Sequence, residues 1–156
     1  MNSIIPNITV PIIKKGITSK NLLFNELNKK RVIVFGVPGA FTPTCSEKHM
    51  PGYLNLHHLF IKKDVDDIYC ISVNDEFVMK SWLLSFTNGE KIIGIADGNG
   101  DIVKKLGLLV DKTASFMGMR SKRFAMIVDD NNIENLFIEN PGEYKNSSAE
   151  YILTQV

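Results

Sequence analysis

Three short apolar runs, each followed by a segment with helical spacing, constrain the fold of this chain more than any other feature. The runs span 31–37, 67–73 and 92–96, and in each of them hydrophobic residues follow one another with little alternation. A strand that is covered on both faces has this pattern, whereas a strand exposed on one face alternates. Strands that alternate with helices predict a central sheet with parallel strands.

Further signals complete the order of elements. Two prolines mark 4–13 as short extended pieces near a sheet edge, and Ser19 is placed to cap a short helix over 19–27. The turn residues between 123–129 and 133–139 predict an antiparallel hairpin. Capping-box spacing at Ser147 to Glu150 predicts a C-terminal helix over 147–153. The predicted fold class is α/β, thioredoxin-like, with a mixed central sheet and helices on both faces.

The helices between the apolar runs have readable boundaries. The longest covers 44–63, with a kink or interruption at 51–52, where proline and glycine follow each other. Asn74 or Asp75 caps the next helix, and a short one covers about 101–106.

Composition limits the classes of protein to consider. The chain has 156 residues, of which 44% are hydrophobic, and this suits a single domain over 1–156 with a substantial core. The formal net charge is +1, which argues against nucleic acid or a membrane surface as the main partner. No apolar run approaches the ~20 residues of a membrane span.

The chain contains two cysteines, Cys45 and Cys70. They form no CxxC pair and no zinc-like cluster with histidines, and Gly98-x-Gly100 lacks the wider pattern of a dinucleotide loop, so neither a metal nor a cofactor is predicted. So few cysteines indicate a reducing compartment. We expect a cytoplasmic protein; an organellar one would need a transit segment that has been trimmed.

Cys45 lies at the end of a proline- and threonine-rich turn that follows the first apolar run. The turn delivers the thiol to the first turn of a predicted helix, where free backbone N–H groups stabilise an anion. Thr42 offers a hydroxyl three residues upstream, and Pro38 and Pro43 stiffen the loop. Because the thiolate is the reactive form of cysteine, this placement indicates a nucleophile rather than a packing residue.

The run 37–46 resembles the signature of the peroxiredoxins, Pro-x-x-x-Thr-x-x-Cys, and within them the subfamily that includes the plant type II enzymes. The resemblance covers nearly the whole chain from about Arg31, with further matches at 49–53, 70–75, 80–82, 96–98 and 120–124. It implies a thioredoxin-like fold and thiol-dependent reduction of hydrogen peroxide and small alkyl hydroperoxides.

The resemblance also implies roles for four residues. Cys45 is the residue that attacks the peroxide, and Thr42 hydrogen-bonds the sulfur and the peroxide. Pro38 shields the sulfenic acid from over-oxidation. Arg123, just before a strand phenylalanine, stabilises the thiolate and orients the peroxide oxygens through its fork of donors. Arg120 and Lys122 are expected on the surface.

The sulfenic acid must be reduced by a second thiol. Cys70 lies in the second apolar run, where a cysteine is usually inert packing. Some relatives carry a resolving cysteine near the C-terminus, but 142–148 contains none. We therefore predict a one-cysteine mechanism with an external reductant, glutathione with glutaredoxin first and thioredoxin second.

Two other functions compete with peroxide reduction. His49, four residues after Cys45, suggests a Cys–His dyad for acyl transfer, but no orienting third residue is identifiable and a structural role is favoured. The alternative of another class is a redox-sensing module that signals through oxidised Cys45. The resemblance also implies a homodimer formed by loops near the active site, at 41–43 and 116–118.

Overall fold

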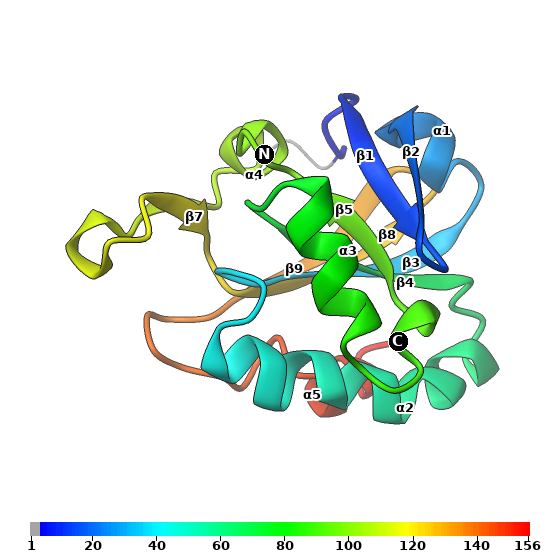
Figure 1. Cartoon of the computed structure of the whole chain (residues 1–156). Coiled ribbons are helices and arrows are strands. Elements are labelled where there is room, and N and C mark those ends of the chain that lie inside the picture. Colours follow the sequence, from blue (N-terminus) through cyan, green and yellow to red (C-terminus); the bar gives the residue numbers. More distant parts are fainter. Residues whose placement is uncertain (1–3) are drawn as a thin grey trace.

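The structure, a computed structural model, describes residues 4–156, and a seven-stranded sheet forms its centre (Figure 1). The strands lie in the order β2-β1-β5-β4-β3-β8-β9. The three apolar runs form its middle as β3 (Arg31–Gly36), β4 (Asp67–Ser72) and β5 (Ile93–Ala96), paired in parallel. The outer pairings are antiparallel and involve β1 (Thr9–Lys14), β2 (Ile17–Leu22), β8 (Phe124–Asp129) and β9 (Asn132–Ile138). The predicted mixed sheet is confirmed.

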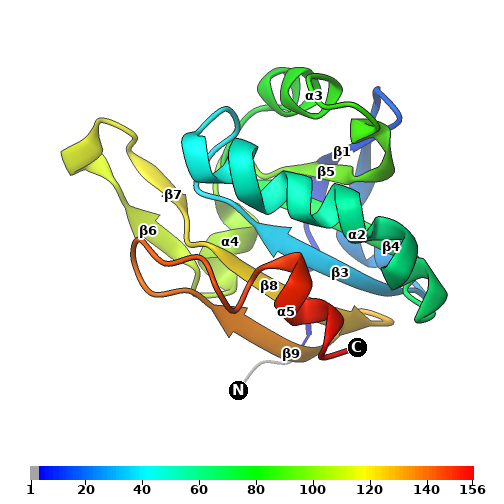
Figure 2. The same ribbon diagram turned by 90° about the horizontal axis from the view of Figure 1, so that it is seen from below.

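Each central strand buries both of its faces. In β3, Ile33 and Phe35 enter one hydrophobic cluster while Val32 and Val34 enter another, because successive side chains point to opposite sides of a sheet. The first face is covered by α2 (Met50–Lys62), α3 (Glu76–Leu84) and α5 (Ala149–Leu153), and the second by α1 (Leu23–Leu27) and α4 (Asp101–Lys105). Figure 2 shows α2 and α5 packed side by side. Helices therefore cover both faces, as predicted.

The prediction of a helix beginning at Ser19 was wrong. Residues Ile17–Leu22 form β2, which pairs with β1, and α1 begins only at Leu23. The hairpin turns at Lys15 and Gly16, both with positive φ, of 50° and 77°. Two consecutive residues with positive φ match the twist of a tight hairpin, so the strand pairing outweighs the capping signal of Ser19.

A small two-stranded ribbon was not predicted. It pairs β6 (Leu109–Asp111) with β7 (Met119–Ser121) and extends away from the body of the molecule (Figure 1). Its strands have only three residues each, which is too short for a periodic pattern. The 3₁₀ turn Thr113–Ser115 lies at its tip, and a second one, Gly89–Lys91, precedes β5.

The long helix is irregular where its first turn meets the rest. A π-helical turn, Cys45–His49, leads directly into α2, with Pro51 in the first turn of α2. The irregularity therefore lies just before 51–52, where the kink was predicted. Pro51 removes one helical N–H donor but does not end the helix. Asp75 caps α3 by accepting from the Val78 N–H at 2.8 Å. Ser148 caps α5.

Candidate active site

The loop after β3 is fixed from several sides. A Cβ atom on Gly39 would lie 2.9 Å from Nη1 of Arg120, so a larger residue would force the two apart. The Ala40 N–H donates to Oδ1 of Asn74 at 2.9 Å, and the Thr42 hydroxyl donates to the Gly39 carbonyl at 2.7 Å. These bonds hold the loop in one conformation before the helical segment begins.

Cys45 is the first residue of the π-helical turn and is 0% exposed. The next residue, Ser46, ties the turn to its surroundings: its N–H donates to the Thr42 carbonyl at 2.9 Å, and its hydroxyl accepts from Nε1 of Trp82 at 2.9 Å. Trp82 is fully buried in the core. Turns of this rare type occur frequently at functional sites.

The register between β3 and β8 brings Arg123 to the cysteine. Gly36 pairs with Phe124, so the residue before Phe124 lies beside the loop after Gly36. A Cβ on Gly36 would collide with the buried Phe124 ring, so a larger residue there would displace that ring. Nη2 of Arg123 lies 3.2 Å from Sγ of Cys45. A fixed cation therefore contacts a buried thiol that is 78 residues away in sequence.

His49 holds the same guanidinium. Nη1 of Arg123 lies 2.8 Å from Nδ1 of His49, and since arginine has only donors, Nδ1 accepts. Nε2 then carries the proton and donates to the Ser147 carbonyl at 3.0 Å. Burial and the Arg123 charge lower the pKa of His49 to about 3, against a weaker opposing effect of the bond to Ser147. His49 is therefore a neutral acceptor, and it contacts Arg123 rather than forming a dyad with Cys45.

A cavity of about 620 Å³ opens beside these groups. Its apolar wall includes Pro38, Pro43, Val110, Met117, Ile138 and Pro141, and its charged side chains are Lys112, Lys122, Arg123, Glu139 and Glu143. Cys45 has no exposed surface, but Arg123, which contacts its sulfur, forms part of the wall. A water molecule occupies roughly 30 Å³ in the liquid, so the cavity has room for an organic hydroperoxide as well as hydrogen peroxide.

The four residues identified from sequence lie together. Pro38, Thr42 and Arg123 line the cavity, and Cys45 contacts Arg123. The Thr42 hydroxyl differs from expectation in one respect, because its single proton is donated to the Gly39 carbonyl rather than to the sulfur. In this arrangement its oxygen offers lone pairs to a peroxide O–H.

Lys122 and Arg120, two cations close to Arg123 in sequence, differ in how exposed they are. Lys122 is exposed, as expected. Arg120 is half-buried, and its Nε donates to the Met117 carbonyl at 2.8 Å. Its guanidinium thus packs over Gly39, in the loop that carries the reactive cysteine.

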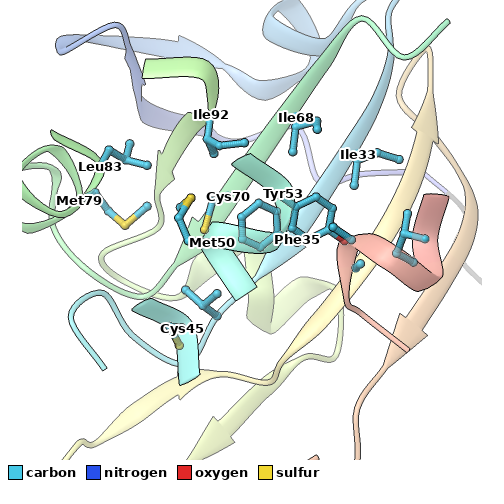
Figure 3. Close-up of a cluster of buried hydrophobic side chains, with 14 of the residues drawn as sticks. Ile33, Phe35, Cys45, Met50, Tyr53, Ile68, Cys70, Met79, Leu83 and Ile92 are labelled. Atoms are coloured by element: carbon cyan, nitrogen blue, oxygen red, sulfur yellow. The ribbon is translucent and has the colours of Figure 1, made fainter. Parts of the chain in front are cut away.

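Cys70 lies in the interior of the first hydrophobic cluster, on the central strand β4. Figure 3 shows it among buried side chains such as Met50 and Tyr53, whereas Cys45 lies at the edge of the group. Burial raises the pKa of Cys70 well above its ordinary value, the neighbouring Cys45 raises it further, and Arg123 opposes this. Cys70 is therefore a protonated thiol at neutral pH.

Sequence reasoning missed the outer part of the site. Asn74 was considered only as a helix cap, yet it anchors the Ala40 N–H. Glu139 and Ser147 were assigned no role at the site, although the Ser147 carbonyl accepts the His49 proton. No local pattern marks these contacts, because Asn74 bonds to a residue 34 positions away and Ser147 to one 98 positions away.

Two searches of residues 4–156 were negative. None of these residues forms a group of three or more His, Cys, Asp or Glu side chains suited to a metal ion. Within the same range, no helix combines the length and the apolar character needed to cross a membrane.

The fold and the site together are those of a thioredoxin-like protein with a reactive thiol. A family model described as Redoxin matches residues 2–153. Peroxiredoxin-2B of Arabidopsis thaliana is 46% identical over 124 residues, which are 80% of this chain and 76% of that protein.

Solved structures of similar proteins have the same fold. Reduced Prx3 from Vibrio vulnificus, in complex with hydrogen peroxide, has a TM-score of 0.92 and 41% identity, covering 99% of this chain and 98% of that chain. The antioxidant protein of Plasmodium falciparum, described as a 1-Cys peroxiredoxin, has a TM-score of 0.89 and 36% identity, covering 97% and 94%. The chain therefore belongs to the peroxiredoxins, in the group that includes the plant type II enzymes, and is a thiol peroxidase.

Proposed function

We propose that the chain reduces hydrogen peroxide and small alkyl hydroperoxides by a one-cysteine mechanism. The thiolate sulfur of Cys45 attacks the terminal peroxide oxygen, an S–O bond forms and the O–O bond breaks. The departing oxygen takes a proton and leaves as water or an alcohol, and Cys45 becomes a sulfenic acid. The observation that carries this proposal is the 3.2 Å contact between Nη2 of Arg123 and Sγ of Cys45.

Arg123, Thr42 and Pro38 act on different parts of this step. Negative charge builds on the departing oxygen, and Arg123 and the helix N–H groups near Thr44 and Cys45 are the donors that stabilise it. Thr42 accepts the peroxide O–H and so orients the molecule. Pro38 has no backbone donor and contributes an apolar wall, which excludes water and shields the sulfenic acid.

An external thiol closes the cycle. It attacks the sulfenic sulfur, releases water and leaves a mixed disulfide on Cys45, which a second thiol then reduces. Cys70 is a poor internal partner because its thiol is buried and its pKa is raised. The Plasmodium falciparum neighbour, described as a 1-Cys peroxiredoxin, supports this choice. Glutathione with glutaredoxin is the first candidate reductant and thioredoxin the second.

Two exposed phenylalanines support a homodimer. Phe41 is 56% and Phe116 97% exposed, and both have positive φ, of 63° and 60°. A bulky residue is strained in that region, and a ring in water offers nothing to offset the strain. Burial of both rings against a second copy would supply the missing contact. Sedimentation of the reduced protein tests this, and a pure monomer would contradict it.

Intact mass measurement tests the mechanism. Reduced protein is treated with one equivalent of hydrogen peroxide, and glutathione or thioredoxin is then added in separate samples. We expect a rapid gain of one oxygen on Cys45, and then a mixed disulfide with the added thiol. A net loss of two hydrogen atoms, with peroxide as the oxidant and no added thiol, would show a Cys45–Cys70 disulfide and contradict the one-cysteine mechanism.

The redox-sensing module remains the alternative function. It predicts that oxidised Cys45 persists in the presence of glutathione, glutaredoxin and thioredoxin while a partner protein binds the oxidised form. Repeated turnover with any of these reductants contradicts it.

A further inference from the structure

Glu139, directly after β9, is a buried carboxylate that the proposed chemistry does not use. It is only 6% exposed, and one of its oxygens, Oε2, accepts from the Lys145 N–H, the Ser147 N–H and the Ser147 hydroxyl. Burial raises the pKa of Glu139, but these bonds outweigh it and keep the pKa below its ordinary value. The carboxylate therefore holds a short loop to the end of the sheet.

The same loop carries the carbonyl that orients His49. The Ser147 carbonyl accepts from Nε2 of His49 at 3.0 Å and from the Tyr53 hydroxyl at 2.7 Å. His49 in turn accepts from Arg123 at 2.8 Å, and Arg123 donates to the sulfur at 3.2 Å. Glu139 also donates its own N–H to the Arg123 carbonyl at 2.9 Å. An unbroken chain of contacts thus runs from Glu139 to the sulfur.

We propose that Glu139 is a positioning residue for peroxide reduction, which fixes the Ser147 carbonyl, through it the tautomer and orientation of His49, and through His49 the guanidinium of Arg123. This inference rests on the proposed role of Arg123. The side-chain bonds of Glu139 go to Lys145 and Ser147 and not to the sulfur. Its effect is geometric, because a donor displaced by about 1 Å costs on the order of a hundredfold in rate.

The carboxylate itself supplies a matched pair of variants. Oε1 is buried and has no hydrogen-bond partner among residues 4–156, and all three bonds go to Oε2. Glu139→Gln can therefore place its amide oxygen at the Oε2 position and keep every bond, while it removes the charge. Glu139→Ala removes the bonds and the charge together. Glu134→Ala, on β9 and exposed, is the control for a glutamate remote from the site.

The test is the second-order rate constant for oxidation of Cys45 by hydrogen peroxide in a single turnover. We expect Glu139→Ala to slow it by about 10- to 100-fold, and Glu139→Gln and Glu134→Ala to stay within about threefold of the parent. Adding His49→Gln to Glu139→Ala should slow the reaction little beyond His49→Gln alone, because residues that act in series are not additive. If Glu139→Ala does not fold, Ser147→Ala, which removes one of the three bonds, should slow oxidation by about tenfold, outside the range of the control.

Three results would overturn the inference. They are an unchanged rate in Glu139→Ala, or in Ser147→Ala where that variant replaces it, an equal loss in Glu139→Gln and Glu139→Ala, and additive losses with His49→Gln. Failure of the proposed function looks different, since the parent Cys45 would then react no faster than free cysteine. A fast parent with an unaffected Glu139→Ala variant contradicts the positioning role alone.

Discussion

Cys45 and Cys70 are both fully buried, yet their surroundings differ. Both belong to the same hydrophobic cluster and both are 0% exposed. Beside Cys45 lie a guanidinium nitrogen at 3.2 Å and a cavity wall, whereas Cys70 lies on a central strand among apolar side chains. Burial alone makes a thiol inert by disfavouring its charge. We infer from the contrast that the donors beside a buried sulfur decide its reactivity.

The largest expected effect comes from removing the reactive sulfur. Cys45→Ser should show no measurable oxidation by stoichiometric peroxide, because a hydroxyl is not deprotonated at neutral pH. Intact mass after one equivalent of hydrogen peroxide is the measurement. A gain of one oxygen in this variant would place the reactive thiol at Cys70.

Replacing the guanidinium of Arg123 should leave Cys45, like Cys70, a buried thiol without a hydrogen-bonded cation. Arg123→Gln removes the cation beside the sulfur and a donor for the departing oxygen, and we expect a slower single-turnover oxidation by about 10²- to 10³-fold. Stopped-flow kinetics with the reduced protein measure it. Lys104→Gln, which removes an exposed cation outside the cavity, is the matched control, and an equal loss there would indicate general electrostatics rather than the contact.

Two substitutions of His49 separate its two contacts. His49→Asn can place its amide oxygen near the Nδ1 position and keep accepting from Arg123. His49→Gln reaches toward the Nε2 position and keeps the bond to the Ser147 carbonyl. Since the contact with Arg123 bears on the sulfur, we expect His49→Gln to be about tenfold slower than His49→Asn in peroxide oxidation. The reverse order would contradict the role assigned to His49.

Acid should lower the free energy of unfolding because of the depressed pKa of His49. The pKa of His49 is about 3 in the folded protein and near 6.5 in the unfolded chain, so the unfolded chain binds more protons between these values. The free energy of unfolding should therefore fall as the pH drops below 6.5, by about 1.4 kcal/mol for each pH unit from this group. Glu26 and Glu139, whose pKa values lie below 4.5, add to the loss only below that pH. Urea unfolding at pH 7 and 5 measures it, and His49→Asn should show a smaller pH dependence.

The smallest effect is expected at Cys70. Cys70→Ala should leave peroxide oxidation within about twofold of the parent, since only packing is lost, and should lower the free energy of unfolding by about 1 kcal/mol. The two measurements together separate packing from catalysis. A large loss of activity with intact stability would overturn the comparison with Cys45.

Predictions from sequence were most accurate for elements whose own residues are enough to determine their structure. The apolar runs of β3, β4 and β5 predicted parallel strands in the middle of the sheet. A strand buried on both faces has few polar residues, so its sequence is a continuous apolar run. The prediction failed for β2, where pairing through the turn at Lys15 and Gly16 outweighed a local capping signal. Around the cysteine, the motif identified the loop and Arg123. The links from Glu139 and Ser147 to His49 arise only when β9 and the following loop pack against the start of α2.

The π-helical turn at Cys45 has a consequence for the timing of the cycle. The Cys45 thiol is 0% exposed, so we expect the turn to open before an external thiol reaches the proposed sulfenic acid. Irregular backbone hydrogen bonds make such a turn a weak part of its helix. While the turn stays closed, however, a second peroxide can enter by the same cavity and oxidise the sulfenic acid further. We therefore expect the opening rate of five residues, Cys45–His49, to set the peroxide concentration at which the enzyme inactivates itself.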